Sequence, residues 1–94
     1  MPEISRFFGV AMDVDVTHVE VLGPYRLHLR FDDGTEGEVD IAELLAFDGV
    51  FAPLRDPAMF RQVRVEPEYG TIVWPNGADI DAFVLHEWAA GRRI

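Results

Sequence analysis

The sequence predicts an α+β fold, a small antiparallel β-meander with further hairpins and two to three helices packed on one sheet face. Residues 25–31 alternate apolar and polar side chains, which is the period of a half-buried strand. An Asp-Asp-Gly turn follows at 32–34 and leads into a second extended stretch. Apolar residues at helical spacing then appear over 41–47 and 80–88.

The 94 residues are enough for one domain. We expect a single α+β domain over 14–94, preceded by an N-terminal arm or edge strand at 1–13. Residues 14–22 have the composition of a strand, which Gly23-Pro24 ends. Alternation predicts two faces for this strand, with Thr17, Val19 and Val21 on the first and His18 and Glu20 on the second.

The length of the turn after Phe31 decides which side chains of the hairpin face water. A two-residue loop would pair Phe31 with Glu36 and place carboxylates on the apolar face. A three-residue loop with a bulge at Gly34 places Phe31 opposite Thr35 instead. The pairs predicted by that loop are Leu29–Gly37, Leu27–Val39, Tyr25–Ile41, Arg30–Glu36, His28–Glu38 and Arg26–Asp40. Because a slip by one residue would turn the apolar set to water, we expect the three-residue loop.

Two short helices are predicted after the hairpin. Asp40 is placed to cap a helix over 41–47, which Asp48-Gly49 ends. Residues 51–54 form a connector with apolar anchors. Asp56-Pro57 then starts a short helix that runs through about Phe60.

A second hairpin and a final helix complete the prediction. The hairpin joins 62–66 to 71–74, with Val65 paired to Ile72 and Val63 to Trp74. The helix begins near Asp79 or Asp81 and ends at Gly91. Its expected buried face consists of Ile80, Phe83, Val84 and Trp88.

Together these segments resemble the bacterial family known as domain of unknown function 2442. The matching features are the tyrosine-led strand, the turn at 31–35, the helix entry at 39–41 and the segment GTIVWPNGADI at 70–80. The resemblance covers about residues 14–88 and implies no activity, cofactor or catalytic residue. The opening 12 residues, MPEISRFFGVAM, are similar to the start of a second family, domain of unknown function 4160. This second resemblance implies a neighbour-encoded protein partner, because members of the two families are often encoded side by side.

Composition excludes several classes of function. The net charge of −9 repels phosphate backbones, so we expect no direct nucleic-acid binding. The absence of cysteine excludes disulfides, thiolate zinc sites and cysteine nucleophiles. No apolar run approaches the ~20 residues that span a bilayer, and the start MPEISRFF lacks the pattern of a secretory signal. We therefore expect a cytoplasmic protein without a membrane partner.

Histidines and carboxylates offer candidate chemistry. His18 and His28 lie on polar strand faces that can be neighbours, and with Glu20 and Glu38 they suggest a small-ligand or metal site. The alternative is that both are surface residues, with His28 facing Glu38. His86-Glu87 does not start a zinc-protease motif, because alanine stands four positions after the histidine.

Acid pairs and the single serine carry weaker signals. The pairs at 13/15, 32/33 and 79/81 sit where turns and helix caps select aspartate. Ser5 has no base at a recognisable spacing, and the glycines form no phosphate loop. Arg92-Arg93 reads as a solvated terminal cluster. We predict no catalytic residue, no cofactor-binding residue and no metal ligand, and leave open whether the protein is an enzyme.

The aromatic residues Phe47, Phe51, Trp74 and Trp88 form a core, or else leave one or two side chains exposed as contact anchors. The favoured function is a non-catalytic protein-interaction or regulatory module. Its expected partners are a neighbour-encoded protein, or a second copy that binds through an edge strand or the Phe7-Phe8 arm. The alternative is a small-ligand or metal-binding protein, or an enzyme, with a site around His18 and His28.

Overall fold

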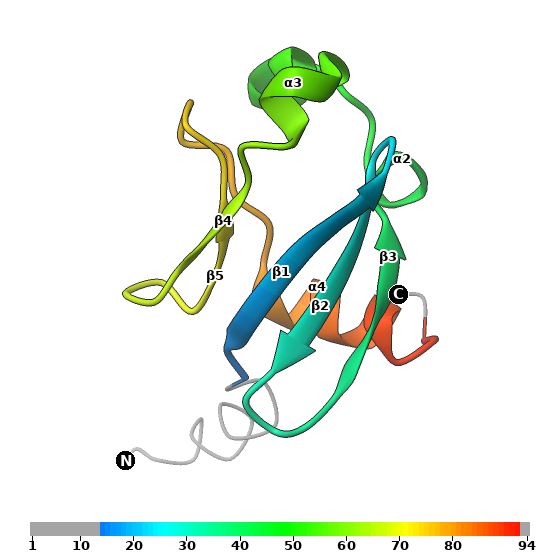
Figure 1. The fold of residues 1–94 in the computed structure, drawn as a ribbon, viewed down its shortest axis with the longest axis vertical. Coiled ribbons are helices and arrows are strands. Elements are labelled where there is room, and N and C mark those ends of the chain that lie inside the picture. The colour runs from blue at the N-terminus through cyan, green and yellow to red at the C-terminus, as the bar shows by residue number, and fades with distance from the viewer. Residues whose placement is uncertain (1–13, 93–94) are drawn as a thin grey trace.

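A computed structural model describes residues 14–92. The predictions for the arm at 1–13, for Ser5, for Asp13 and for Arg93 lie outside the described residues. The described elements are, in order, β1 (Val16–Gly23), β2 (Arg26–Phe31), β3 (Glu36–Asp40), α2 (Ile41–Leu44), the 3-10 helix η1 (Gly49–Arg55), α3 (Pro57–Phe60), β4 (Arg64–Glu66), β5 (Thr71–Val73) and α4 (Ala82–Ala89). Antiparallel hairpins and short helices make the chain an α+β fold, as predicted (Figure 1).

The central feature is a three-stranded antiparallel sheet in the order β1-β2-β3. Its hairpin register pairs Leu29 with Gly37 and Arg30 with Glu36, which confirms the three-residue loop. Phe31 N donates to Thr35 O at 2.9 Å, and Gly34 has the positive φ of +91° that the bulge requires. The inward side chains of β2 are therefore buried, while their alternating neighbours face water.

Strand β1 differs from the prediction at Thr17. Its register shifts between Val16 and His18, where β1 has one residue more than β2, and shifts again between Val21 and Gly23. At the first irregularity, the side chain of Thr17 is exposed to solvent and that of Val16 is buried, with 2 % exposure. The prediction that Thr17 shares the inner face with Val19 and Val21 is wrong, because a bulge inverts the alternation of side chains.

The second hairpin, β4–β5, lies beside the lower part of β1 (Figure 1). Val65 pairs with Ile72, as predicted. The ladder is shorter than expected and does not include the pair Val63–Trp74. Val16 N donates to Gly70 O at 2.9 Å, so one backbone hydrogen bond ties the two hairpins together.

The first helix after the hairpin, α2, is shorter than predicted. Asp40 caps α2 through Ala42 N at 3.0 Å, but the helix ends at Leu44 and does not reach residue 47. Leu45 is extended, with φ −147°. This extension lets Phe47 pack on Tyr25, with 4.9 Å between ring centroids. The expected connector at 51–54 lies within η1.

Prediction and structure agree on α3, where Asp56 accepts a hydrogen bond from Ala58 N and Pro57 opens the helix.

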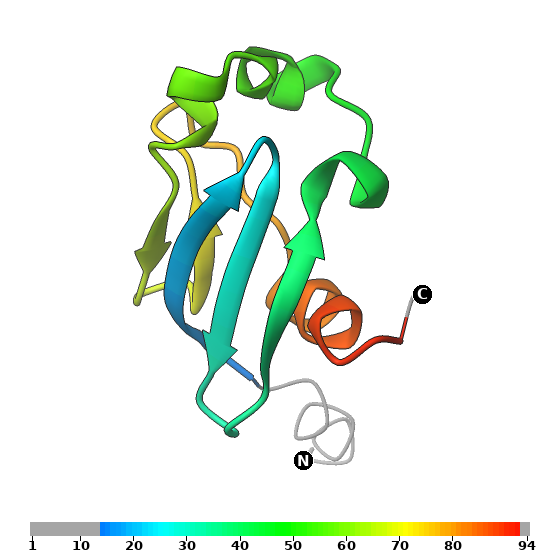
Figure 2. The same cartoon turned by 45° about the vertical axis from the view of Figure 1, so that its right-hand side comes forward.

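The last helix, α4, packs beneath β3 on the inner face of the sheet (Figure 2). Asp81 caps it, with Oδ1 accepting from Phe83 N at 2.8 Å. The fully buried residue of the helix is Leu85, and the core-packed positions beside it are Ala82, Trp88 and Ala89. Of the predicted face, Ile80 and Trp88 do belong to the core or pack against it, whereas the prediction is wrong for Phe83 and Val84, because the buried stripe of α4 is centred on Leu85.

The core lies between the sheet, α4 and the β4–β5 hairpin. Trp74 is 1 % exposed, and its Nε1 donates to Phe60 O at 2.9 Å. Phe47, Phe51 and Trp88 are half-buried and pack against the core, whereas Tyr69, at 69 % exposure, is the large aromatic left in solvent among residues 14–92. No described helix is long and apolar enough to cross a membrane.

Candidate functional site

The outer face of the sheet is an ion-paired surface. Its polar residues are His18 and Glu20 of β1, Arg26, His28 and Arg30 of β2, and Glu36, Glu38 and Asp40 of β3. Glu36 Oε1 lies 2.9 Å from His28 Nε2 and 3.2 Å from Arg30 Nε. These hydrogen bonds, first that of His28 and then that of Arg30, lower the pKa of Glu36.

The two candidate histidines share this face but are not cross-strand partners. His18 stands opposite Arg30, and His28 stands between Glu20 and Glu38. His28 directs Nε2 to Glu36, a residue the sequence reasoning did not assign to it. Within residues 14–92, no three histidine or acidic side chains are grouped so that they could hold a metal ion. The geometry here is that of surface ion pairs.

A third histidine, His86, joins α4 to the tip of the first hairpin. Its Nε2 lies 2.8 Å from Asp33 Oδ2 and 3.2 Å from Thr35 Oγ1. Its Nδ1 lies 3.2 Å from Glu87 Oε2. The ring also stands edge-on to Phe31 at 5.0 Å, and the side chain is 12 % exposed.

Glu87 and Arg92 extend the cluster of charged groups around His86. Arg92 donates to both carboxylate oxygens of Glu87, at 2.7 and 2.9 Å. The Arg92 guanidinium, and then His86, lower the pKa of Glu87 to about 2. The backbone N–H of Thr35, and then His86, lower the pKa of Asp33. Arg92 is exposed, in keeping with the predicted solvated cluster, and it also forms an ion pair with Glu87 that the sequence does not predict.

The His86 cluster is not arranged as a base that activates a nucleophile. Thr35, His86 and Glu87 follow the order of a catalytic triad, but Asp33 approaches Nε2 more closely than Thr35 does. Carboxylates only accept hydrogen bonds, so the Nε2 that lies 2.8 Å from Asp33 Oδ2 acts as a donor there and is not aimed as an acceptor at the Thr35 hydroxyl. The cluster thus fastens α4 to the hairpin.

The paired aspartates mainly bind backbone. Asp32 Oδ1 accepts from Asp15 N at 3.2 Å, and Asp33 Oδ1 accepts from Thr35 N at 2.9 Å. Asp81 caps α4. Asp15, Asp79 and Asp81 also border a shallow polar hollow of about 510 Å³. The roles of Asp33 and Asp81 match the turn and cap interpretation of the sequence, whereas the bond of Asp32 to Asp15 N is a long-range contact.

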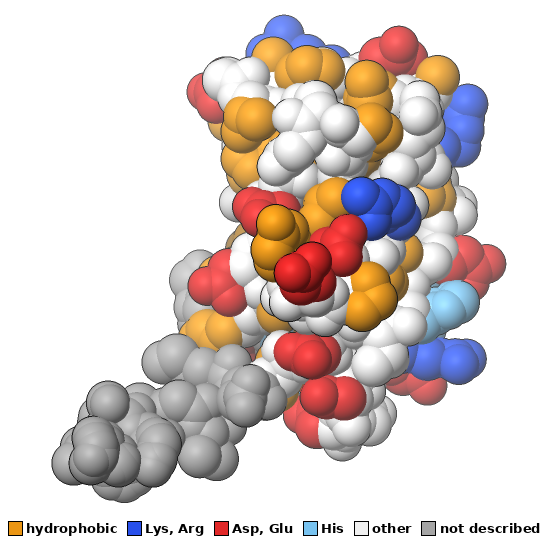
Figure 3. Space-filling view, turned by 90° about the vertical axis from the view of Figure 1, so that its left-hand side faces the viewer, with side chains coloured by type: hydrophobic (Ala, Val, Ile, Leu, Met, Phe, Trp, Pro, Cys, Tyr) orange, Lys and Arg blue, Asp and Glu red, His pale blue; other side chains and the backbone are white. Residues whose placement is uncertain are grey.

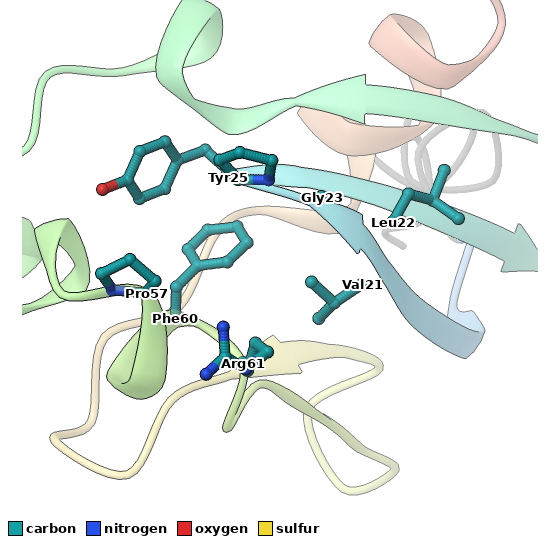
Figure 4. A pocket seen from close by; sticks show the side chains of 8 residues that line it. Val21, Leu22, Gly23, Tyr25, Pro57, Phe60 and Arg61 are labelled. Carbon is teal, nitrogen blue, oxygen red and sulfur yellow. The ribbon is translucent and has the colours of Figure 1, made fainter.

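A second hollow is mostly apolar and lies between the end of β1 and α3 (Figure 4). We call it the β1–α3 groove. Its volume is about 370 Å³, within the range of ligand sites in proteins. Its lining residues are Val21, Leu22, Gly23, Pro24, Tyr25, Pro57, Phe60 and Arg61. No sequence motif predicted this groove. Its residues at the end of β1 fit a strand and a turn, and its residues in α3 fit the start of a helix, so neither group suggests a binding site by itself.

Tyr25 lines the groove and has an uncommon backbone conformation. Its φ is +69°, the one positive value among described residues other than glycine. Its hydroxyl donates to Arg55 O, and its ring stands edge-on to Phe60 at 5.3 Å. Side-chain contacts on two sides therefore compensate the strained backbone at a site that faces the groove.

Strand β2 shows which backbone groups of the sheet are paired. Phe31 N donates to Thr35 O, and Ile41 N donates to Tyr25 O at 2.7 Å. The odd-numbered residues of β2 therefore bond to β3, and the even-numbered ones bond to β1.

The same alternation leaves part of β1 open. In the register of β1 with β2, His18 and Glu20 face even-numbered residues of β2. The backbone groups of Val19 and Val21 consequently point away from the sheet. Within the described chain, no other segment's carbonyl accepts from the N–H of Val19 or Val21. An open strand edge thus runs up to the groove.

A model of a known protein family matches most of the chain. The family model described as "Protein of unknown function (DUF2442)" matches residues 16–91. The chain belongs to the DUF2442 family. This membership confirms the first resemblance, while the resemblance of residues 1–12 to a second family stays a prediction. No curated protein and no solved structure matches the chain. The DUF2442 family therefore supports the uncharacterised-domain prediction without adding an activity.

Proposed function

We propose that this DUF2442 domain is a non-catalytic protein-interaction module, and that the β1–α3 groove receives an extended segment of its partner. The observation that carries the proposal is the position of an apolar groove at the end of an open strand edge. Partner segments commonly bind this way, since main-chain hydrogen bonds to a strand edge give affinity and a neighbouring pocket gives specificity.

The surroundings of the groove fit a binding surface. Val21 and Phe60 direct apolar side chains toward the same space from β1 and α3 (Figure 4). Leu22, on the groove wall, is 44 % exposed. Figure 3, which looks onto the β4 side, shows hydrophobic side chains exposed between acidic ones, so charge does not screen this side uniformly. Apolar groups with an adjacent hydrogen-bonding edge are the elements of a peptide site.

A second copy of the chain is the less favoured occupant of the other edge, β3. Its residues Glu36 and Glu38 carry carboxylates on the outer face of that edge. Antiparallel pairing of two β3 strands would bring like charges together across the new interface. We propose a different protein as the partner, encoded by a neighbouring gene, and a cytoplasmic location for the complex.

The experiment is capture from a lysate of the source organism by three immobilised proteins. Gly23→Phe blocks the groove, because a Cβ at Gly23 meets no atom within 4 Å and the residue borders the groove. Ala42→Phe adds the same side chain at an exposed position on α2, away from the groove. We expect wild type and Ala42→Phe to retain the same protein and Gly23→Phe to lose it, with unchanged circular dichroism. Equal capture by all three proteins would refute the groove as the binding surface.

A further inference from the structure

Arg61 stands at the rim of the β1–α3 groove as an exposed cation. Five of the eight basic residues are Arg26, Arg30, Arg55, Arg64 and Arg92, and each donates to or pairs with a group of the described chain. The guanidinium of Arg61 has no hydrogen bond or ion pair within residues 14–92. In a protein with a net charge of −9, a cation left unpaired beside an apolar groove is an informative exception.

The groove therefore combines three recognition elements within one short stretch. Val21 offers an N–H and a carbonyl at the open edge, Val21 and Pro57 offer an apolar wall, and Arg61 offers a forked donor. A guanidinium pairs with a carboxylate through two parallel hydrogen bonds, a geometry that an ammonium does not match. The charge thus favours an anionic group beside the apolar anchor of the ligand.

Resting on the proposed function, we infer that the groove selects an extended partner segment in which a large apolar side chain is followed by an acidic residue. The segment pairs its backbone with Val21, places the apolar side chain against Pro57 and the side chain of Val21, and directs its carboxylate to Arg61. A basic segment is disfavoured, because it would bring a second cation to Arg61.

The size of the groove agrees with this occupant. Its volume of about 370 Å³ is at the lower end of the range for whole small-molecule ligands. One aromatic or branched side chain with its flanking backbone fits that space better than a cofactor of nucleotide size. The lip at Gly23 leaves room for the backbone of the segment, because a Cβ there would meet nothing within 4 Å.

The test uses two acetylated and amidated pentapeptides, Thr-Val-Phe-Asp-Thr and Thr-Val-Phe-Asn-Thr, which differ in a single charge. Binding is followed through the amide shifts of the full-length protein by ¹H–¹⁵N NMR titration. We expect wild type to bind the Asp peptide about two- to fivefold more tightly than the Asn peptide, with shifts centred on Val21 and Gly23. Arg61→Gln should remove that difference, and raising the salt concentration should reduce it.

Four other results have separate meanings. Equal affinity for both peptides at the groove overturns the acidic selectivity and leaves the proposed function intact. Binding of neither peptide by wild type, together with unchanged capture by Gly23→Phe, overturns both. The inference is also overturned if wild type binds free 3-phenylpropanoate more tightly than the Asp peptide, since the occupant is then a small acid. It is overturned likewise if light scattering shows self-association that Gly23→Phe abolishes, since the occupant is then a second copy. Gly23→Phe is the control that must bind no peptide.

Discussion

Replacing Gly37 with alanine tests how α4 is seated on the sheet. A Cβ at Gly37 would lie 2.2 Å from Ala89 O and 3.1 Å from Ala89 C, whereas ordinary contact begins at 3.4 Å. Both atoms belong to the backbone of α4, so no flexible side chain can move aside. The helix must shift by roughly 1 Å, which is the difference between the first distance and ordinary contact.

The magnitude follows from what the shift disturbs. Leu85 is fully buried beneath the sheet, and Trp88 packs against the same core. Overpacking of this kind costs about 1–3 kcal/mol. For a domain of this size, we expect Gly37→Ala to lower the melting temperature by about 4–8 °C for each kcal/mol lost.

The assay is urea unfolding monitored by circular dichroism, with Gly23→Ala as the matched control. Gly23 has open space at its Cβ and no positive φ. The same chemical change there should leave stability within about 1 kcal/mol of wild type, since it mainly reduces the entropy of the unfolded chain. Wild-type stability in Gly37→Ala would refute the close seating of α4 on β3.

Three further predictions concern other contacts. The lowered pKa values of Glu87, to about 2, and of Asp33 mean that their stabilising effect is complete above the ordinary values near 4 and is lost as pH falls toward 2. Urea midpoints should therefore fall less on acidification in Glu87→Gln than in wild type, and equal losses would contradict the cluster. Asp81→Ala should cost about 1 kcal/mol in thermal melts by removing the cap of α4, whereas Asp79→Ala should stay within about 0.5 kcal/mol. Thr71→Val should cost about 1–2 kcal/mol, because the buried hydroxyl donates to Ile80 O at 2.5 Å; an unchanged urea midpoint would count against that bond.

The first hairpin could be predicted from the sequence because one physical term dominates it. A slip by one residue would expose Leu27 and Leu29, which are fully buried, so the pattern of the hairpin itself determines the loop length without any long-range contact. The caps at Asp40 and Asp56 were predictable for a related reason. A side chain that binds a backbone N–H two residues ahead is a local interaction.

The errors lie where distant segments decide. The bulge at Thr17 depends on the pairing of β1 with β2 and on its contact with the β4–β5 hairpin. Helix α2 ends early, and the chain after it is extended so that Phe47 packs on Tyr25. The set of α4 residues that is buried depends on the close packing of Ala89 against Gly37, and the periodicity of the sequence does not reveal that contact. Tertiary packing overrides local propensity at each of these positions.

The candidate site was harder to predict than the fold. The groove is assembled from a strand end and a helix about 35 positions later, and its backbone edge has no side-chain signature. Arg61 was indistinguishable from other surface arginines until their partners were known. The spacing around His86 indicates only that it does not start a zinc-protease motif, and its contacts with Asp33 and Thr35 span more than 50 positions.

Amide hydrogen exchange of the full-length protein, with and without saturating Thr-Val-Phe-Asp-Thr peptide, tests the central claim most directly. The account predicts slower exchange at Val21 and its neighbours in β1, because the open edge acquires a partner strand, and no change at Glu36 and Glu38. Protection of β3 with unchanged exchange in β1 would contradict it.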